Sequence, residues 1–238
     1  MQRRGFTLIE LMIVIAIIAI IAAIAIPGLL QSQRAANERN ASASLKSIAT
    51  AEIDFRSNDR DQNRVNDFWT GNVWGLYSIQ TSTDDSSWQP CGKYIDMSLA
   101  AADNFAASDI KGSGTGWYWQ IDDATKPTAG PKAGYWYYAL DSDASSGSAV
   151  TYKVDTDGTG KLVHNASSFG FGCYPDTLGA GRSLFMINEG ATLIRLPLNE
   201  SVRDGSSFPP DKNPKKTNNV DPSIWPDDTT LKKFSRTD

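Results

Sequence analysis

The sequence predicts an α+β protein in which a long N-terminal helix packs on a small antiparallel β-sheet head. A continuous apolar run extends from Phe6 to Leu30, with one charged residue among its 25. No proline or glycine occurs between Leu29 and Phe55, so a helix can continue past the apolar run. The second half of the chain alternates short aromatic or β-branched runs with turn-forming residues, which is typical of antiparallel strands.

The apolar run is long enough to cross a membrane, since about 20 apolar residues span the hydrocarbon core as a helix. Arg3 and Arg4 precede it, so the positive-inside rule places the N-terminus in the cytoplasm and the body outside. An ordinary secretory signal has a shorter apolar core, followed by small residues at its cleavage site. Ile26-Pro27-Gly28 does not fit that pattern, which favours an anchor.

Glu10 is the one charged residue within the apolar run. An ionised side chain inside a membrane span costs about 2.5–3.5 kcal/mol on insertion scales and usually marks a functional position. A plain membrane anchor leaves Glu10 without a role. It lies four residues after Phe6, which is about one helical turn.

The start of the run resembles the prepilin signature of type IV pilins and type II secretion pseudopilins. The residues that carry the resemblance are Gly5, Phe6, Thr7, Leu8, Ile9 and Glu10, with arginines before them and the apolar run after them. The resemblance implies a leader peptide, residues 1–5, that ends at Gly5. It implies that Phe6 becomes an N-methylated mature N-terminus and that Glu10 pairs with the N-terminal amine of a neighbouring subunit. It also implies a helix kink at Pro27.

The same resemblance implies partners and a location. The partners would be identical or homologous pilin subunits, a prepilin peptidase and an inner-membrane assembly platform. Before assembly the chain would be a single-pass protein of the bacterial inner membrane, with its N-terminus cytoplasmic and its head outside. After assembly it would belong to a cell-surface filament.

From the residue pattern we expect one helix over about residues 6–58, interrupted near Pro27 because proline lacks a backbone N–H. Residues 6–30 would form a transmembrane and filament-core half, and residues 31–58 an amphipathic continuation. The positions expected to face the head are Ala41, Leu45, Ile48, Glu52 and Phe55, which recur at spacings of three and four. Two separate helices joined at Pro27 are the alternative.

Residues 59–201 would form a globular pilin-like head. The expected elements are a short helix within 94–108, strands at 117–121 and 134–140, and hairpins made by 149–154 with 161–163 and by 183–187 with 191–196. Residues 202–238 contain five prolines and would form an extended segment draped over the sheet. Disorder of this segment is the alternative.

Cys91 and Cys173 both lie in the expected head. An even number of cysteines in an exported domain favours a disulfide. Such a bond would close a loop of about 80 residues, which the chain-entropy model values at about 4 kcal/mol. Two free buried thiols are the alternative.

No catalytic constellation emerges, so we expect no enzyme activity, no cofactor and no metal site. His164 is the only histidine and is expected on the surface at a strand end. Asp155, Asp157 and Gly158 resemble the start of a calcium loop but lack the glutamate that ends an EF-hand loop, so a hairpin turn is expected there. The net charge of −4 argues against nucleic-acid binding.

These inferences predict a structural subunit of a type IV pilus that is processed and polymerised. A pseudopilin of a type II secretion system is one alternative. A membrane-tethered binding module that does not polymerise is another, suggested by the aromatic strands. Consecutive strand residues point to both faces of a sheet. We therefore expect those aromatic side chains to fill the core and subunit contacts.

Overall fold

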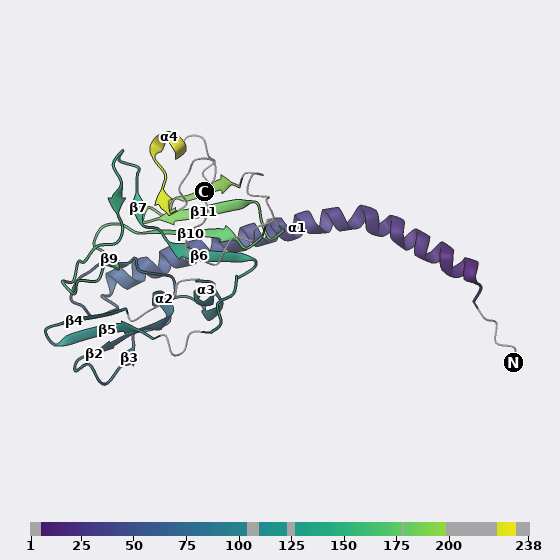
Figure 1. Cartoon of the computed structure of the whole chain (residues 1–238). Coiled ribbons are helices and arrows are strands. Elements are labelled where there is room, and N and C mark those ends of the chain that lie inside the picture. The colour runs from purple at the N-terminus through teal and green to yellow at the C-terminus, as the bar shows by residue number, and fades with distance from the viewer. Residues whose placement is uncertain (1–5, 104–109, 123–126, 178, 199–222, 232–238) are drawn as a thin grey trace.

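The computed structural model describes residues 6–103, 110–122, 127–177, 179–198 and 223–231. Within these residues the chain forms one long helix and a head of several small, mainly antiparallel sheets, which confirms the predicted α+β class. Figure 1 shows the N-terminal half of helix α1 projecting away from the head, whereas its C-terminal half runs along the head. The head is therefore built around the second half of this helix.

Helix α1 (Leu8–Ser57) passes through Pro27 without a break. The expected interruption near Pro27 is therefore wrong. Proline removes one backbone hydrogen bond, and the bonds of the neighbouring turns keep the helix continuous. Figure 1 shows that the projecting half is curved, so Pro27 lies within a bent but unbroken helix.

The second half of α1 buries the face that the residue spacing predicts. The five predicted positions, Ala41, Leu45, Ile48, Glu52 and Phe55, are all at most 1% exposed. They pack against strands of the head, chiefly β10, β11 and β1. Burial of these apolar side chains stabilises the contact by roughly 1.5–3 kcal/mol for each large one.

The sheet beside α1 is antiparallel, in the order β12-β11-β10-β6. Its strands are β6 (Tyr135–Ala139), β10 (Gly170–Pro175), β11 (Ser183–Asn188) and β12 (Leu193–Pro197). Strand β6 confirms the strand predicted at 134–140. Strands β11 and β12 confirm the predicted second hairpin, in which Ile187 lies opposite Leu193.

The two faces of this sheet bury different side chains. Tyr135 and Tyr137 belong to the cluster that includes the buried face of α1. Trp136, between them, belongs to a second cluster with Trp225 and Leu231. This is the alternation that a strand imposes on consecutive residues. The sheet is thus covered by α1 on one face and by C-terminal residues on the other.

The remaining elements are short. They are β1 (Phe68–Trp69), β2 (Ile79–Ser82), β3 (Gln89–Pro90), β4 (Lys111–Gly114), β5 (Trp117–Ile121), β7 (Ser142–Asp143), β8 (Val150–Thr151), β9 (His164–Asn165), β13 (Ile224–Trp225), α2 (Gly75–Ser78), α3 (Met97–Ala101) and α4 (Asp228–Leu231). The strands among them form the sheets β3-β2-β5-β4, β13-β7-β8 and β1-β9. Strand β5 confirms the strand predicted at 117–121, and α3 lies within the predicted short helix.

The hairpin predicted between residues 149–154 and 161–163 is paired differently in the structure. Strand β8 pairs with β7 rather than with residues 161–163. Val154 and His164 form an isolated bridge at the base of the turn instead. Residues 155–160, between these two positions, form a turn with side chain–backbone hydrogen bonds of its own, described below.

Gly5, the rest of the expected leader and most of residues 202–238 lie outside the described residues. Within that C-terminal part, residues 223–231 include β13 and α4. Trp225 is 2% exposed and Leu231 is 9% exposed. This short piece is therefore packed on the sheet through two apolar side chains.

The predicted disulfide is not formed in this structure, in which Cys91 and Cys173 are both free thiols. Cys173 is fully buried on β10, opposite Tyr137 of β6 and Phe185 of β11. Cys91 follows β3 in the other four-stranded sheet, where its N–H donates to the carbonyl of Ile79. Backbone hydrogen bonds thus fix the two cysteines in different sheets.

Candidate functional site

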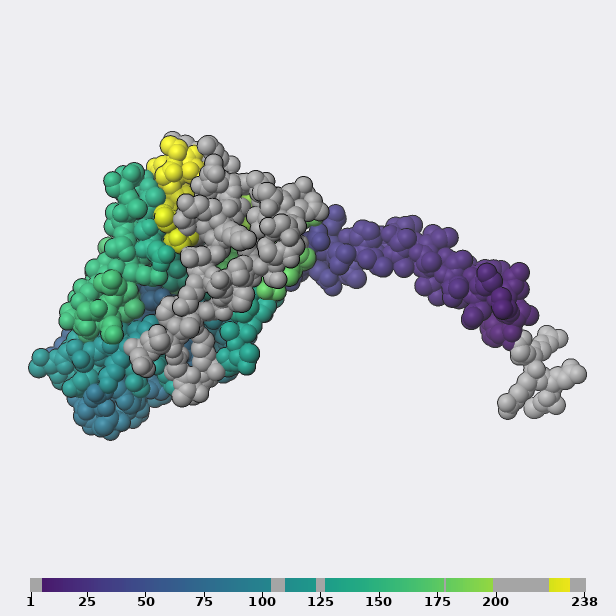
Figure 2. Space-filling model, viewed as in Figure 1, coloured from purple at the N-terminus to yellow at the C-terminus, as the bar shows by residue number. Residues whose placement is uncertain are grey.

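The projecting half of α1 is an uncovered apolar surface. The large side chains between Phe6 and Leu30 are exposed, with Phe6 at 86% and Ile24 at 77%. Figure 2 shows the head packed around the other half of α1 only. An 18-residue window within α1 has a mean hydropathy of 3.1, so the helix is long and apolar enough to cross a membrane. An apolar surface of this extent calls for lipid or protein cover.

A capping box formed by Thr7 and Glu10 begins this helix. The backbone N–H of Thr7 donates to Oε2 of Glu10 at 2.8 Å, and the Thr7 hydroxyl donates to the same oxygen at 2.7 Å. In return, the Glu10 N–H donates to the Thr7 hydroxyl oxygen at 3.4 Å. The box satisfies backbone donors that the first turn of a helix leaves unpaired.

Hydrogen bonds at the base of the projecting half fix its direction relative to the head. The side chain of Arg34 donates to the carbonyl of Gly179 at 3.3 Å, and that of Asn37 donates to the carbonyl of Ala180 at 2.9 Å. Glu38 accepts from the backbone N–H of Arg182 at 3.0 Å and from the guanidinium of Arg195 at 2.7 Å. The helix therefore leaves the head from a defined junction.

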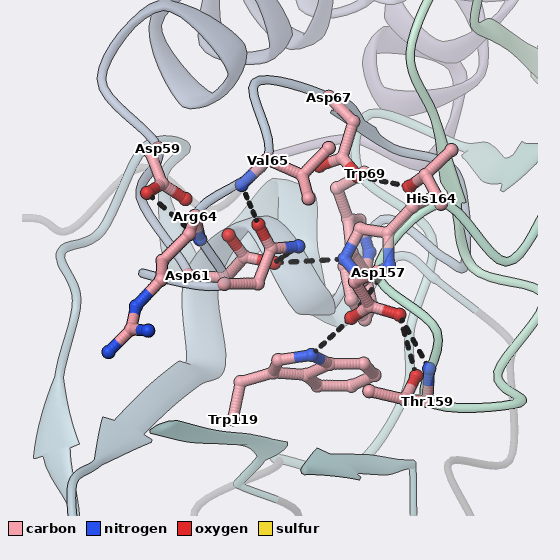
Figure 3. A network of polar contacts seen from close by, with 12 residues as sticks. Asp59, Asp61, Arg64, Val65, Asp67, Trp69, Trp119, Asp157, Thr159 and His164 are labelled. Carbon is pink, nitrogen blue, oxygen red and sulfur yellow. Dashed lines mark hydrogen bonds and ion pairs between the residues drawn. The ribbon is translucent and has the colours of Figure 1, made fainter. Parts of the chain in front are cut away.

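A second polar site lies inside the head, where the loop after α1 meets β9. Asp61, Asp67 and His164 come together there, each at most 1% exposed (Figure 3). His164 is thus not the surface histidine that the sequence predicts. The indole rings of Trp69 and Trp119 pack edge-on against its imidazole, with centroids 5.2 and 5.1 Å away. These rings exclude water from the cluster.

Carboxylates face both nitrogens of His164. Its Nε2 lies 3.0 Å from Oδ2 of Asp61, and its Nδ1 lies 3.7 Å from Oδ2 of Asp157. Burial lowers the pKa of His164, but the close contact and charge of Asp61, with the charges of Asp67 and Asp157, outweigh it and raise that pKa. Burial also raises the pKa of Asp67 to about 6, against the opposing effect of His164.

Glu52 brings a further buried carboxyl group from α1. It is 0% exposed, and its Oε2 accepts the backbone N–H of Trp69 at 2.9 Å. Burial raises the pKa of Glu52 well above its usual range. Through this hydrogen bond Glu52 ties α1 to strand β1.

The turn over residues 155–160 uses its aspartates as hydrogen-bond acceptors. Oδ1 of Asp157 accepts from the N–H and hydroxyl of Thr159 at 3.2 and 2.7 Å, and its Oδ2 accepts from the indole of Trp119 at 2.8 Å. Asp155 accepts from the N–H of Gly160 at 2.8 Å. Gly158 and Gly160 have φ of 75° and 76°, which suits glycine. The segment is a turn that side chains stabilise.

The N-terminal segment matches a known family model. Residues 1–26 match the family model described as the prokaryotic N-terminal methylation motif. Over 67 residues the chain is 48% identical to the type IV major pilin protein PilA of Myxococcus xanthus (strain DK1622). That alignment covers 28% of this chain and 29% of the relative. No solved structure matches the chain.

The fold and the motif together define a class: an α+β head on a long apolar helix that begins with an N-terminal methylation motif. More particularly, these findings support the predicted resemblance to type IV pilins. The chain spans less than a third of the length of the relative it matches. The activity and partners of the whole protein are therefore a matter for proposal.

Proposed function

We propose that this chain is a structural subunit of a type IV pilus. It would be cleaved after Gly5, N-methylated at Phe6 and polymerised through α1 into an extracellular filament. The observation that carries the proposal is the projecting half of α1, which is apolar, uncovered and has a single carboxylate near its tip. Such a helix suits first a membrane and then the core of a helical filament.

The apolar side chains alone do not favour one register of packing. Lipid tails are as apolar as leucine, so moving the helix from lipid to a bundle of helices gains little hydrophobic free energy. Polar contacts are then the groups that specify how neighbouring helices align. Glu10 is the one charged side chain available for this between Phe6 and Leu30.

An ammonium group is the partner that Glu10 requires. Thr7 supplies two neutral hydrogen bonds to the Glu10 carboxylate but no compensating charge. A buried carboxylate without a counter-charge is strongly destabilising. Cleavage after Gly5 would create a new ammonium at Phe6, and the Phe6 of one subunit would meet the Glu10 of another. Prepilin peptidase and an inner-membrane assembly platform would carry out processing and assembly.

A pseudopilin of a type II secretion system would share all these features of α1. The similarity to a major pilin of Myxococcus xanthus favours the pilus. The two functions differ in product, because a pilus subunit is abundant in long filaments sheared from the cell surface. A membrane-tethered binding module that does not polymerise is the third function to be tested.

The test is the substitution Glu10→Gln in a cell that expresses the full chain. Glutamine keeps an oxygen for the Thr7 hydrogen bonds and removes only the charge. We expect the yield of sheared filaments to fall at least about tenfold, because the loss of one member of a close charge pair weakens an interface by that much or more. The amount of this protein in the membrane should stay the same. Asp54→Asn is the matched control on the same helix, because Asp54 lies at the opposite end of α1 and pairs with Arg60. Wild-type filament yield from Glu10→Gln would refute polymerisation through Glu10.

A further inference from the structure

We propose that Asp61, Asp67 and His164 bind a single divalent ion of the zinc type. The site would fasten the loop after α1 to β9 and thereby hold the head together. It is independent of the proposed filament function and departs from the sequence-based expectation of no metal site. Four features of the cluster support it.

The first feature is the spacing of the three side chains. Each offers one possible ligand atom, and these atoms all lie within 4.8 Å of one another. Zinc binds histidine nitrogen and carboxylate oxygen at about 2.0–2.2 Å in tetrahedral geometry, so two of its ligands are separated by about 3.3–3.6 Å. Side-chain movements of about 1 Å would therefore bring Asp61, Asp67 and His164 around a common ion.

The second feature is the way in which His164 meets Asp61. Neither ring nitrogen of His164 makes a well-aligned hydrogen bond within the described part of the chain. Nε2 nevertheless lies 3.0 Å from Oδ2 of Asp61. Neighbouring ligands of a tetrahedral zinc ion lie about 3.3 Å apart without bonding to each other. A close but misaligned nitrogen–oxygen contact fits two ligands of one ion.

The third feature is a pair of buried oxygens that accept no hydrogen bond. Oδ1 of Asp61 and Oδ1 of Asp67 have no hydrogen-bond partner among the described residues, and each residue is 1% exposed. Leaving such atoms unpaired in a protein interior is costly, and more so when they are charged. A divalent cation supplies the missing contacts of these two oxygens.

The fourth feature is the set of groups that orient the ligands (Figure 3). Asn63 donates to Oδ2 of Asp61 at 2.8 Å, and the hydroxyl of Thr156 donates to Asp67. Asp157 faces Nδ1 of His164 and is itself held by the indole of Trp119. Histidines that bind metals usually direct their second nitrogen at a carboxylate in this way. Asp157 is a positioning residue here, not a ligand.

The ligand set identifies the class of ion. Imidazole together with carboxylate suits zinc and its first-row neighbours, whereas calcium and magnesium take oxygen ligands. The full burial of all three ligands points to a structural site rather than to a site open to substrate. Such ions are bound as the protein folds, so binding free energy adds to folding stability.

The experiment uses the full chain purified in detergent, stripped with a chelator and refolded with zinc. We expect one zinc per chain by elemental analysis, and affinity at least about tenfold lower for Asp67→Asn and His164→Gln. Asp176→Asn is the matched control, because Asp176 likewise accepts a side-chain hydrogen bond, from the indole of Trp136, but lies outside the cluster. This control should bind zinc like the wild type.

Cobalt gives a readout that does not depend on how well the variants fold. Trp69 and Trp119 contact His164, so a paramagnetic cobalt ion in the site should quench part of the wild-type tryptophan fluorescence. Added zinc should restore it. Absence of quenching in the wild type would overturn the proposal, as would zinc binding that survives in both ligand variants. Stoichiometric calcium binding in place of zinc would also overturn it.

Discussion

The carboxylate of Glu10 accepts hydrogen bonds from both the backbone N–H and the hydroxyl of Thr7, at 2.8 and 2.7 Å. Within a single chain, the charge proposed to direct assembly is therefore engaged in capping its own helix. The two roles are distinct, because capping needs an oxygen acceptor whereas pairing with an ammonium needs the charge.

Thr7→Val separates these roles. Valine removes the hydroxyl of the capping box and leaves the Glu10 carboxylate intact. Loss of an N-cap hydroxyl destabilises a helix by about 1 kcal/mol, which frays the first turn without preventing a charge pair. We expect filament yield close to that of the wild type, measured by shearing and quantitative immunoblotting. Loss of filaments as severe as in Glu10→Gln would show instead that capping is what matters.

Glu52 provides a test of the contact between α1 and the head. Glutamine keeps an oxygen that can accept the N–H of Trp69, so Glu52→Gln should change the free energy of unfolding by less than about 1 kcal/mol. Glu52→Ala leaves the buried N–H of Trp69 without an acceptor and opens a cavity, so it should cost about 2–4 kcal/mol. Denaturant unfolding of the detergent-solubilised chain, followed by tryptophan fluorescence, measures both. Equal losses for the two variants would mean that Trp69 does not depend on Glu52.

The thiols of Cys91 and Cys173 should be free in the exported protein. Burial raises the pKa of Cys91 to about 11 and that of Cys173 well above its usual range. Both should therefore react slowly with iodoacetamide in the native protein at pH 8. In denaturant without reductant, both should be alkylated fully, as read by mass spectrometry. A peptide pair linked through these two cysteines would restore the disulfide that the sequence predicts.

Asp96 should make the stability of the head depend on acid pH. It caps α3 through the N–H groups of Ser98 and Leu99 and pairs with Lys132. Burial acts to raise its pKa, but these hydrogen bonds, chiefly that from Lys132, lower it to about 2 from a usual 3.8. A lowered carboxyl pKa contributes stability above the unfolded value, which is lost as the pH falls from about 4 to about 2.

Asp96→Ala should therefore lower the free energy of unfolding by about 1 kcal/mol at pH 7, a typical value for an N-cap. This loss of stability relative to the wild type should shrink as the pH approaches 2. Asp96→Asn is the matched control, because asparagine also caps helices. Thermal unfolding monitored by circular dichroism at several pH values measures the effect. A difference that does not vary with pH would exclude the ionised Asp96 as its source.

Local patterns predicted the parts of the fold in which neighbours in sequence determine the outcome. The three- and four-residue spacing from Ala41 to Phe55 identified the buried face of α1. The turn between Ile187 and Leu193 identified the β11–β12 hairpin. The interruption expected near Pro27 was wrong, because the rule for an interior proline is local whereas the hydrogen bonds of adjoining turns keep α1 continuous. The kink at Pro27 stays a prediction.

The buried cluster could not be predicted in this way. Asp61 and Asp67 lie in the loop after α1, whereas His164 lies on β9, and only the β1–β9 pairing brings them together. No motif with a recognisable spacing connects these three residues, because they come from distant parts of the chain. Trp69 and Trp119, which seal His164 from water, likewise come from separate strands. The pairing of Cys91 with Cys173 was likewise inferred from their number alone, and both are free thiols in the structure.

Mass spectrometry of protein recovered from sheared surface filaments tests the central claim most directly, because it shows both where the chain resides and how it was processed. The account predicts that this chain is present and that its first residue is N-methylated Phe6. Absence of the chain from the filament fraction, with the protein retained in the membrane and beginning at Met1, would contradict it.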